Sequence, residues 1–284
     1  MLRKSTIQLL RFHFSFFLLP VYLFALSQLP EVDWTDALMV FAILHLLVYP
    51  SSNGYNSYMD RDETPIGGLA SPLLPTRQLY HATLGMDGVA VLLSLSISPV
   101  FALGILLYIL ASRAYSYRGI RLKKYPFVGF LTVFLFQGAA VFWLTWHACH
   151  PQQPLPVPLL PCLLSSLLIG ALYPLTQVYQ HEEDRKDGVT TISYVLGKKG
   201  TFILSMMLFL SATMLMYILL GEKKANHFYL FLLILLPVVL FFLYWMRKVW
   251  RDEREASFRN SLMMNILATL CTTVYFTTLI ILNH

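Results

Sequence analysis

The stretch PFVGFLTVFLFQGAAVFWLTWH, residues 126–147, contains no Asp, Glu, Lys or Arg. A helix needs about 20 mostly apolar residues to cross the hydrocarbon core of a bilayer, and this stretch meets that length. The whole chain has the same character, because 57% of its 284 residues are hydrophobic and only 13% are charged. Soluble domains are about 25% charged. The sequence therefore predicts an all-α, polytopic membrane protein.

The composition also excludes other classes of protein. Too few polar residues are present to cover soluble domains, and the hydrophobic content is too high for a disordered chain. The three cysteines, Cys149, Cys162 and Cys271, are odd in number and scattered among apolar stretches, so neither a disulfide framework nor a cysteine metal site is expected. We expect one transmembrane domain over residues 1–284, with no protein partner implied.

Apolar stretches long enough for spanning helices divide the chain into nine predicted transmembrane segments. The first lacks a small-residue cleavage site, so it is read as a retained helix and not as a signal peptide. The predicted segments are 12–29, 37–56, 82–97, 98–115, 126–147, 157–180, 201–220, 228–246 and 260–282.

The basic residues give the orientation of these nine segments. If the N-terminus is cytoplasmic, all of the 21 Lys and Arg residues except Lys223 and Lys224 fall on the cytoplasmic side. Positive residues concentrate on that side of membrane proteins, and eight or ten segments would scramble the partition. The basic character thus reflects membrane topology, and nucleic acid is not an expected partner.

A first polar cluster closes the second predicted segment. Asn53, Asn56 and Asp60 are spaced three and four residues apart, which puts them on one face of a helix. Asp62 and Glu63 follow directly after the end of the same segment. Three oxygen-bearing side chains on one stripe can point into a helix bundle.

A second polar cluster closes the sixth predicted segment. Gln180, Asp184 and Asp187 share one helical face, and Glu183 lies beside them. Both clusters fall at the cytoplasmic ends of apolar helices. Two acidic clusters on one side of the membrane suit a hard divalent cation, and Mg²⁺ in particular is held by one or two carboxylates together with substrate phosphates. Solvated helix ends are the alternative interpretation.

A basic stretch, YSYRGIRLKK at residues 115–124, lies between the two acidic clusters. Cytoplasmic loops are commonly basic for reasons of topology alone. The functional alternative is a phosphate clamp, in which Arg and Lys neutralise a departing diphosphate.

Taken together, these features resemble the UbiA superfamily of intramembrane prenyltransferases over most of the chain. That family has nine transmembrane helices, Asp-rich motifs after the second and sixth, and a basic loop after the fourth. Residues 115–124 resemble the family's basic loop, and DRKDGVTT at residues 184–191 resembles its second motif.

The resemblance implies a UbiA-like bundle and a Mg²⁺-assisted reaction. An allylic prenyl diphosphate would be ionised near the cytoplasmic face of the membrane (the inner membrane, if the cell is bacterial), and the prenyl group would pass to an aromatic or other lipophilic acceptor. The residues expected to be catalytic are Asp60 and Asp184. The expected metal ligands are Asn56, Asp60, Gln180, Glu183, Asp184 and Asp187. Expected substrate contacts are Asn53, Tyr117, Arg118, Arg121, Lys123, Tyr173, Gln177 and Arg185.

Both acidic motifs depart from the family pattern. The first motif of the family reads Asn-x-x-x-Asp-x-x-x-Asp, but Thr64 stands at the third position here, where Asp62 or Glu63 is a possible substitute. The second reads Asp-x-x-x-Asp, and Gln180 replaces its first Asp when Asp184 is aligned with the second. We therefore expect a metal site with fewer carboxylate ligands and an altered set of contacts to the diphosphate.

Two alternatives to prenyl transfer remain at this point. An intramembrane terpene cyclase would use the same ionisation but quench the carbocation internally. A transporter or a non-catalytic membrane protein would use the bundle without this chemistry. Against transport, the charged clusters lie at one rim, whereas transport sites lie near the bilayer midplane.

Overall fold

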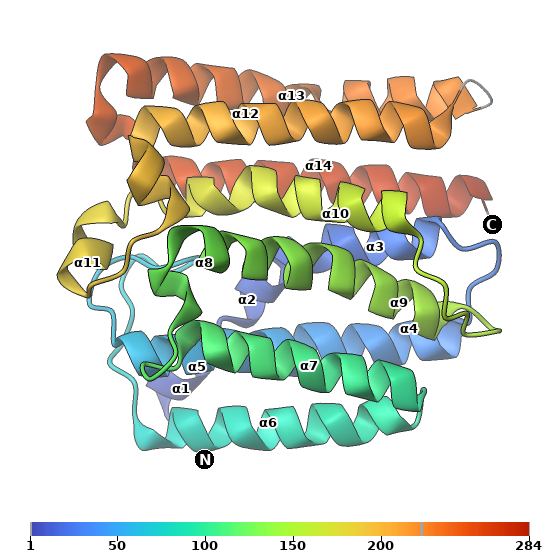
Figure 1. Ribbon diagram of the computed structural model, residues 1–284, viewed down its shortest axis with the longest axis horizontal. Helices are drawn as coiled ribbons and strands as arrows, with labels where there is room; N and C mark the ends of the chain where they lie inside the picture. The colour runs from blue at the N-terminus through green and yellow to red at the C-terminus, as the bar shows by residue number, and fades with distance from the viewer. Residues whose placement is uncertain (1, 222–223, 284) are drawn as a thin grey trace.

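The computed structural model describes residues 2–221 and 224–283 of the chain. Within these residues the elements are all helical, and no β-strand is present. Figure 1 shows the long helices side by side in one bundle, with the short helix α11 at one end and the C-terminus at the other. The all-α fold class predicted from the composition is confirmed.

The N-terminal half consists of helices interrupted by short 3-10 or π segments. In chain order they are α1 (Lys4–Leu10), α2 (Phe12–Ser15), the 3-10 helix η1 (Phe16–Leu18), α3 (Leu19–Ser27), α4 (Trp34–Phe41), the π-helical η2 (Ala42–Val48), α5 (Tyr49–Asp60), α6 (Arg77–Leu95) and α7 (Pro99–Ser116).

The C-terminal half ends in three long helices. Its elements are the 3-10 helix η3 (Leu122–Lys124), α8 (Pro126–Val133), the π-helical η4 (Phe134–Ala140), α9 (Val141–Cys149), α10 (Leu159–Leu172), the 3-10 helix η5 (Tyr173–Thr176), α11 (His181–Lys186), α12 (Ile192–Leu220), α13 (Ala225–Arg251), the 3-10 helix η7 (Glu253–Glu255) and α14 (Phe258–Asn283).

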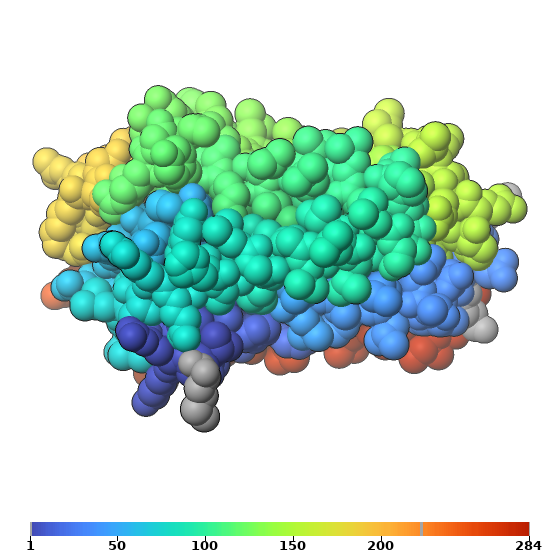
Figure 2. Space-filling view, turned by 90° about the horizontal axis from the view of Figure 1, so that it is seen from below, coloured from blue at the N-terminus to red at the C-terminus, as the bar shows by residue number. Residues whose placement is uncertain are grey.

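Eight helical stretches among the described residues are long and apolar enough to cross a membrane. They are Lys4–Ser27, Trp34–Asp60, Pro99–Ser116, Pro126–Cys149, Leu159–Thr176, Ile192–Leu220, Ala225–Arg251 and Phe258–Asn283. The protein is a multi-pass integral membrane protein. The remaining predicted segment, 82–97, corresponds to α6, which packs beside α5 and α7 (Figure 2) but is not among the eight. Nine spans and a cytoplasmic N-terminus thus stay predictions, and Lys223 lies outside the described residues.

Close packing in the middle of the bundle depends on a glycine. A Cβ atom at Gly138 would lie 2.4 Å from the Cα of Ser166, so only glycine fits where η4 crosses α10. The Ser166 hydroxyl accepts a hydrogen bond of 3.0 Å from the Ala139 backbone N–H. Because the hydrocarbon core offers no water to a displaced N–H, this contact supports the wide π turn of η4.

A partly buried ion pair joins α6 to α7 within the bundle. Arg113, inside the predicted segment 98–115, lies in the last turn of α7 and binds the Asp87 carboxylate. The two side chains are 15% and 14% exposed. Ser51 of α5 donates to Asp87 at 2.6 Å and accepts from Arg113 at 2.9 Å. The pairing with Asp87 allows the Arg113 guanidinium to lie largely out of solvent.

Removing one charge of this pair is expected to destabilise the protein, because the other charge stays buried without its partner, at a cost of about 3–5 kcal/mol. Asp87→Leu and Arg113→Met should each lower the thermal unfolding temperature of the detergent-solubilised protein. The double variant should regain most of the loss, whereas additive losses in the double variant would contradict this account.

Candidate active site

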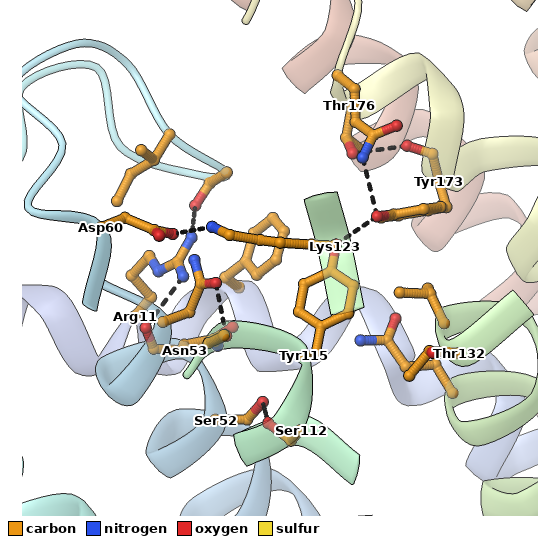
Figure 3. Close-up of a pocket in the computed structure, with 18 of the residues that line it drawn as sticks. Arg11, Ser52, Asn53, Asp60, Ser112, Tyr115, Lys123, Thr132, Tyr173 and Thr176 are labelled. Carbon is orange, nitrogen blue, oxygen red and sulfur yellow. Dashed lines mark hydrogen bonds and ion pairs between the residues drawn. The ribbon is translucent and has the colours of Figure 1, made fainter. Parts of the chain in front are cut away.

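A cavity of about 270 Å³ lies at the end of the bundle where α5 ends and α11 begins. Its walls come from α2, η1, α5, α7, η3, α8, η4, α10, η5, α11 and α14 and from loops between them. Figure 3 shows Asp60 and Arg11 on one side of it, Tyr173, Thr176 and Thr132 on the other, and Tyr115 between them. Among the labelled residues, the charged Asp60 and Arg11 thus lie apart from Tyr173, Thr176 and Thr132.

The first acidic cluster lies on the cavity wall. Helix α5 continues regularly to Asp60, so the spacing of Asn53, Asn56 and Asp60 brings all three to the cavity. The Asn56 side-chain oxygen accepts a hydrogen bond of 2.8 Å from Ser116 of α7. Asp62 also lines the cavity, as does Thr64, whereas Glu63 is exposed outside it.

The second acidic cluster reaches the cavity by a different route from the one predicted. Segment 157–180 was expected to be one helix, but α10 ends at Leu172 and the 3-10 helix η5 follows, with Pro174 as its second residue. A proline lacks the N–H that a continuing helix needs. After a turn, Gln180, Glu183, Asp184 and Asp187 all line the cavity. Gln180 caps the start of the short helix α11, Glu183 and Asp184 lie within it, and Asp187 caps its end.

Basic side chains connect the two acidic clusters. Lys123 forms an ion pair with Asp60. Arg121 forms one with Asp187 and approaches Asp60 at 3.5 Å. Arg118 lies 3.5 Å from Asp187 and donates to the Met59 carbonyl at 2.8 Å. The basic stretch thus holds the ends of α5 and α11 together.

The part of the cavity lined by Asp60, Asp62, Asp184 and Lys123 is here called its mouth. Two carboxyl groups at this mouth have raised pKa values. Burial raises the pKa of Asp184 to about 7, with Asp60 and Asp62 adding to the rise and Lys123 opposing it. Burial, followed by the Asp60 charge, raises the pKa of Asp62 to about 6. The Asp184 Oδ2 atom is buried and has no hydrogen-bond partner. A bound group with positive charge would stabilise the ionised form of both carboxyl groups.

Sequence reasoning missed Arg11 as a site residue. It was assigned to the segment before the first membrane span, but the helical stretch begins at Lys4 and breaks at Arg11, whose φ is 47°. The guanidinium, 5% exposed, donates at 3.1 Å to the carbonyl groups of Gly67 and Asn53. A lone basic residue at the edge of an apolar stretch gives no signal of such a break.

Uncharged polar side chains also line the cavity. Tyr115 and Tyr173 share a hydrogen bond between their hydroxyl groups, and the Gln177 amide donates to the Tyr173 hydroxyl at 2.8 Å. Of the predicted substrate contacts, Tyr173, Gln177, Asn53 and Lys123 line the cavity. Arg118 and Arg121 adjoin its acidic residues. Tyr117 and Arg185 are exposed and outside it.

A second cavity adjoins the first inside the bundle. It has a volume of about 410 Å³ and an almost wholly apolar lining from α3, α10, α12, α13 and α14. Phe17, Ile169 and Leu172 line both cavities. A charged mouth and an apolar chamber therefore share a wall.

Comparison with known proteins gives the family of the chain. Residues 15–268 match the model of the UbiA prenyltransferase family. The chain therefore belongs to the UbiA prenyltransferase family, and it is a transferase of prenyl groups within the membrane. A search of individual curated proteins gave no match.

Solved structures with the same fold extend over nearly the whole chain. A UbiA homologue from Archaeoglobus fulgidus, bound to DMAPP and Mg²⁺, superposes with a TM-score of 0.69 at 18% identity, covering 98% of this chain and 99% of that one. An apo UbiA homologue from Aeropyrum pernix K1 gives 0.65 at 18% identity, covering 92% and 97%. A digeranylgeranylglyceryl phosphate synthase structure gives 0.59 at 18% identity, covering 98% and 97%. At this identity the likeness shows the fold.

The raised pKa of Asp184 predicts how the stability of the metal-free protein depends on pH. The folded state binds this proton more tightly than the unfolded state, whose pKa is near the ordinary 3.8. The resulting stability is present below about pH 4 and is lost as pH rises through about 7.

Asp184→Asn removes this charge at every pH. In the presence of a chelator, the variant should unfold at a higher temperature than the parent at pH 8, and the difference should shrink by pH 5. Thermal unfolding in detergent measures both, and a difference that does not change with pH would contradict the assignment.

Proposed function

We propose that the protein is a Mg²⁺-dependent enzyme that ionises an allylic prenyl diphosphate and transfers the prenyl group to a lipophilic acceptor. The observation that carries this proposal is the joining of an acid-rich, cation-bordered mouth to an apolar chamber. A diphosphate and a hydrocarbon tail need these two environments. Structures of a UbiA homologue bound to DMAPP or to GPP with Mg²⁺ support the same substrate class.

The oxygen donors at the mouth fit Mg²⁺. Asp60 and Asp184 would hold the ion, with amide oxygens of Asn56 and Gln180 beside them and Glu183 and Asp187 further out. Asp62 supplies the carboxylate that Thr64 lacks. Among the described residues no three acidic, His or Cys side chains form a ready metal cluster, but Mg²⁺ usually takes only one or two carboxylates and completes its shell with water and substrate phosphate. The buried, unpartnered Oδ2 of Asp184 supports this fit.

The chain's own cations would stabilise the leaving diphosphate. Bound Mg²⁺ supplies charge neutralisation at the departing oxygens. Lys123 and Arg11 line the mouth, and Arg121 and Arg118 stand behind it. Charged donors held in place in a dry site stabilise developing negative charge more strongly than water does.

The allylic carbocation needs protection from water until the acceptor attacks. The rings of Tyr49, Tyr108, Tyr115, Tyr173 and Phe136 line the cavity beyond the mouth, and aromatic faces attract cations. The apolar chamber behind Phe17, Ile169 and Leu172 suits the prenyl tail.

The metal assignment is tested by two substitutions that keep side-chain size. Purified Asp60→Asn and Asp184→Asn should lose Mg²⁺-dependent release of diphosphate from geranyl diphosphate by about 100-fold or more, because each removes a charge that stabilises the transition state. Glu182→Gln, an exposed neighbour of the second cluster, serves as the control and should be unaffected. Full activity in both Asp variants would end the metal-site proposal.

Product analysis from the same reactions separates transfer from cyclisation. A transferase forms its prenylated product only when an acceptor is supplied. A cyclised hydrocarbon formed without any acceptor would instead favour the terpene cyclase.

The charge distribution supports an active site at the cytoplasmic face, because the basic stretch at residues 115–124 borders the mouth. Arg118 lies in the loop after α7, at that end of the bundle, and Gln152 lies in the loop between α9 and α10, at the opposite end (Figures 1 and 2). Each is replaced by cysteine for the test. In a cysteine-free background and in vesicles of known orientation, a membrane-impermeant thiol reagent should label Arg118→Cys only from the cytoplasmic side. It should label Gln152→Cys only from the other side, and the reverse pattern would overturn the orientation.

A further inference from the structure

Helix α11 carries Asp184 to the cavity but has little stability of its own. It is six residues long, and the side chain of its N-cap residue, Gln180, makes no capping hydrogen bond. Isolated helices shorter than about 12 residues are marginal in water. Figure 1 shows α11 at the end of the bundle, apart from the long helices. Its position must therefore come from contacts with other elements.

The C-terminal end of α11 is held by the basic stretch. Arg121 forms an ion pair with Asp187 and also donates to the Asp187 backbone carbonyl at 3.0 Å. The Val189 N–H donates to the Asp184 carbonyl at 2.7 Å, which closes the turn after the helix. These contacts fix the chain at and after Asp184, so the start of the helix needs a separate attachment.

The start of α11 is attached to α12 through a buried chain of polar side chains. The Nε2 atom of His181 lies 2.8 Å from the Ser193 hydroxyl, and this hydroxyl lies 3.0 Å from the Thr201 hydroxyl. Ser193 and Thr201 are both 0% exposed. The Tyr194 ring packs edge-on against the imidazole, with the ring centres 5.6 Å apart. His181 is thus held by two neighbouring residues of α12.

The hydroxyl protons give this chain of hydrogen bonds a direction. The Thr201 hydroxyl donates to the backbone carbonyl groups of Gly197 at 2.8 Å and Ser193 at 3.2 Å. Because it has a single proton, it acts as the acceptor toward the Ser193 hydroxyl. The Ser193 hydroxyl then donates to Thr201 and accepts from His181. The network therefore assigns the proton of a neutral His181 to Nε2.

His181 acts on the cavity through its neighbours. It does not line the cavity, whereas Gln180, Glu183 and Asp184 do. Asp184 lies one helical turn after His181, and its backbone N–H donates to the Gln180 carbonyl at 2.9 Å. A tilt of the helix start would therefore move Asp184 as well.

We infer that His181 is a positioning residue: through Ser193 and Thr201 it holds the start of α11 against α12 and keeps the Asp184 carboxylate turned into the cavity. The inference rests on the proposed function, in which Asp184 holds Mg²⁺. It adds a residue that contributes to metal binding without touching the metal or the substrate.

Metal binding without turnover tests this role. Mn²⁺ takes the same oxygen ligands as Mg²⁺, and electron paramagnetic resonance measures its free concentration. Geranyl thiodiphosphate, which resists ionisation, supplies the phosphates. His181→Leu should raise the Mn²⁺ dissociation constant about tenfold, because the buried Ser193 hydroxyl loses its donor. His181→Gln, which offers an amide N–H in place of the imidazole N–H, should stay within about twofold of the parent.

Two further variants separate this role from a general loss of stability. Ser193→Ala interrupts the same chain and should raise the Mn²⁺ dissociation constant by a similar factor. The double variant with His181→Leu should bind Mn²⁺ no more weakly than the poorer single variant, because the two residues share one interaction. The control is His81→Leu, at an exposed histidine of α6, and it should leave the constant unchanged. Lower stability alone would not change a dissociation constant measured on folded protein.

An unchanged Mn²⁺ dissociation constant in either His181→Leu or Ser193→Ala would overturn the inference. So would equal rises in His181→Leu and His181→Gln, because the N–H donor would then not matter. If His181→Leu does not fold, Ser193→Ala decides the question, since it removes one oxygen atom only. Failure of the parent protein to bind Mn²⁺ with the analogue would instead count against the proposed function, and would remove the ground on which this inference rests.

Discussion

The contacts of Lys123 and Arg121 with the two acidic clusters are the constraint on which the site depends. Without them, the carboxylates at the end of α5 and around α11 would repel one another. Lys123 binds Asp60, and Arg121 binds Asp187 while approaching Asp60 at 3.5 Å. These cations hold the acidic segments around one cavity. Neutralisation is incomplete, however, since burial still raises the pKa of Asp184 to about 7.

That residual imbalance links stability to chemistry. The buried Asp184 oxygen has no hydrogen-bond partner, which costs free energy in a protein interior, and a divalent ion with a diphosphate would satisfy it. Under the proposed function, the acid-rich and cation-bordered part of the cavity would hold the leaving diphosphate. The apolar chamber behind their shared wall suits a prenyl tail. The carboxyl group whose pKa is raised is thus also a proposed metal ligand, and perturbed pKa values commonly cluster at functional sites.

Regular helical periodicity was enough to predict the first acidic face, because α5 runs without interruption to Asp60. It failed where the backbone leaves the helix. Pro174 ends α10 in a 3-10 turn, and Arg11 adopts a left-handed conformation between α1 and α2. The Asp87–Arg113 pair was also beyond sequence reasoning, because it depends on which helices are neighbours. Composition and spacing therefore predicted the membrane fold and both acidic clusters, whereas tertiary contacts determined the partners.

The central claim is that the cavity binds a diphosphate together with Mg²⁺. The most direct measurement is calorimetric titration of the purified protein with geranyl thiodiphosphate, an analogue that resists ionisation, with and without Mg²⁺. We expect binding that requires Mg²⁺ and is lost in Asp60→Asn. Equal binding in the presence of a chelator, or no binding with Mg²⁺ present, would contradict it.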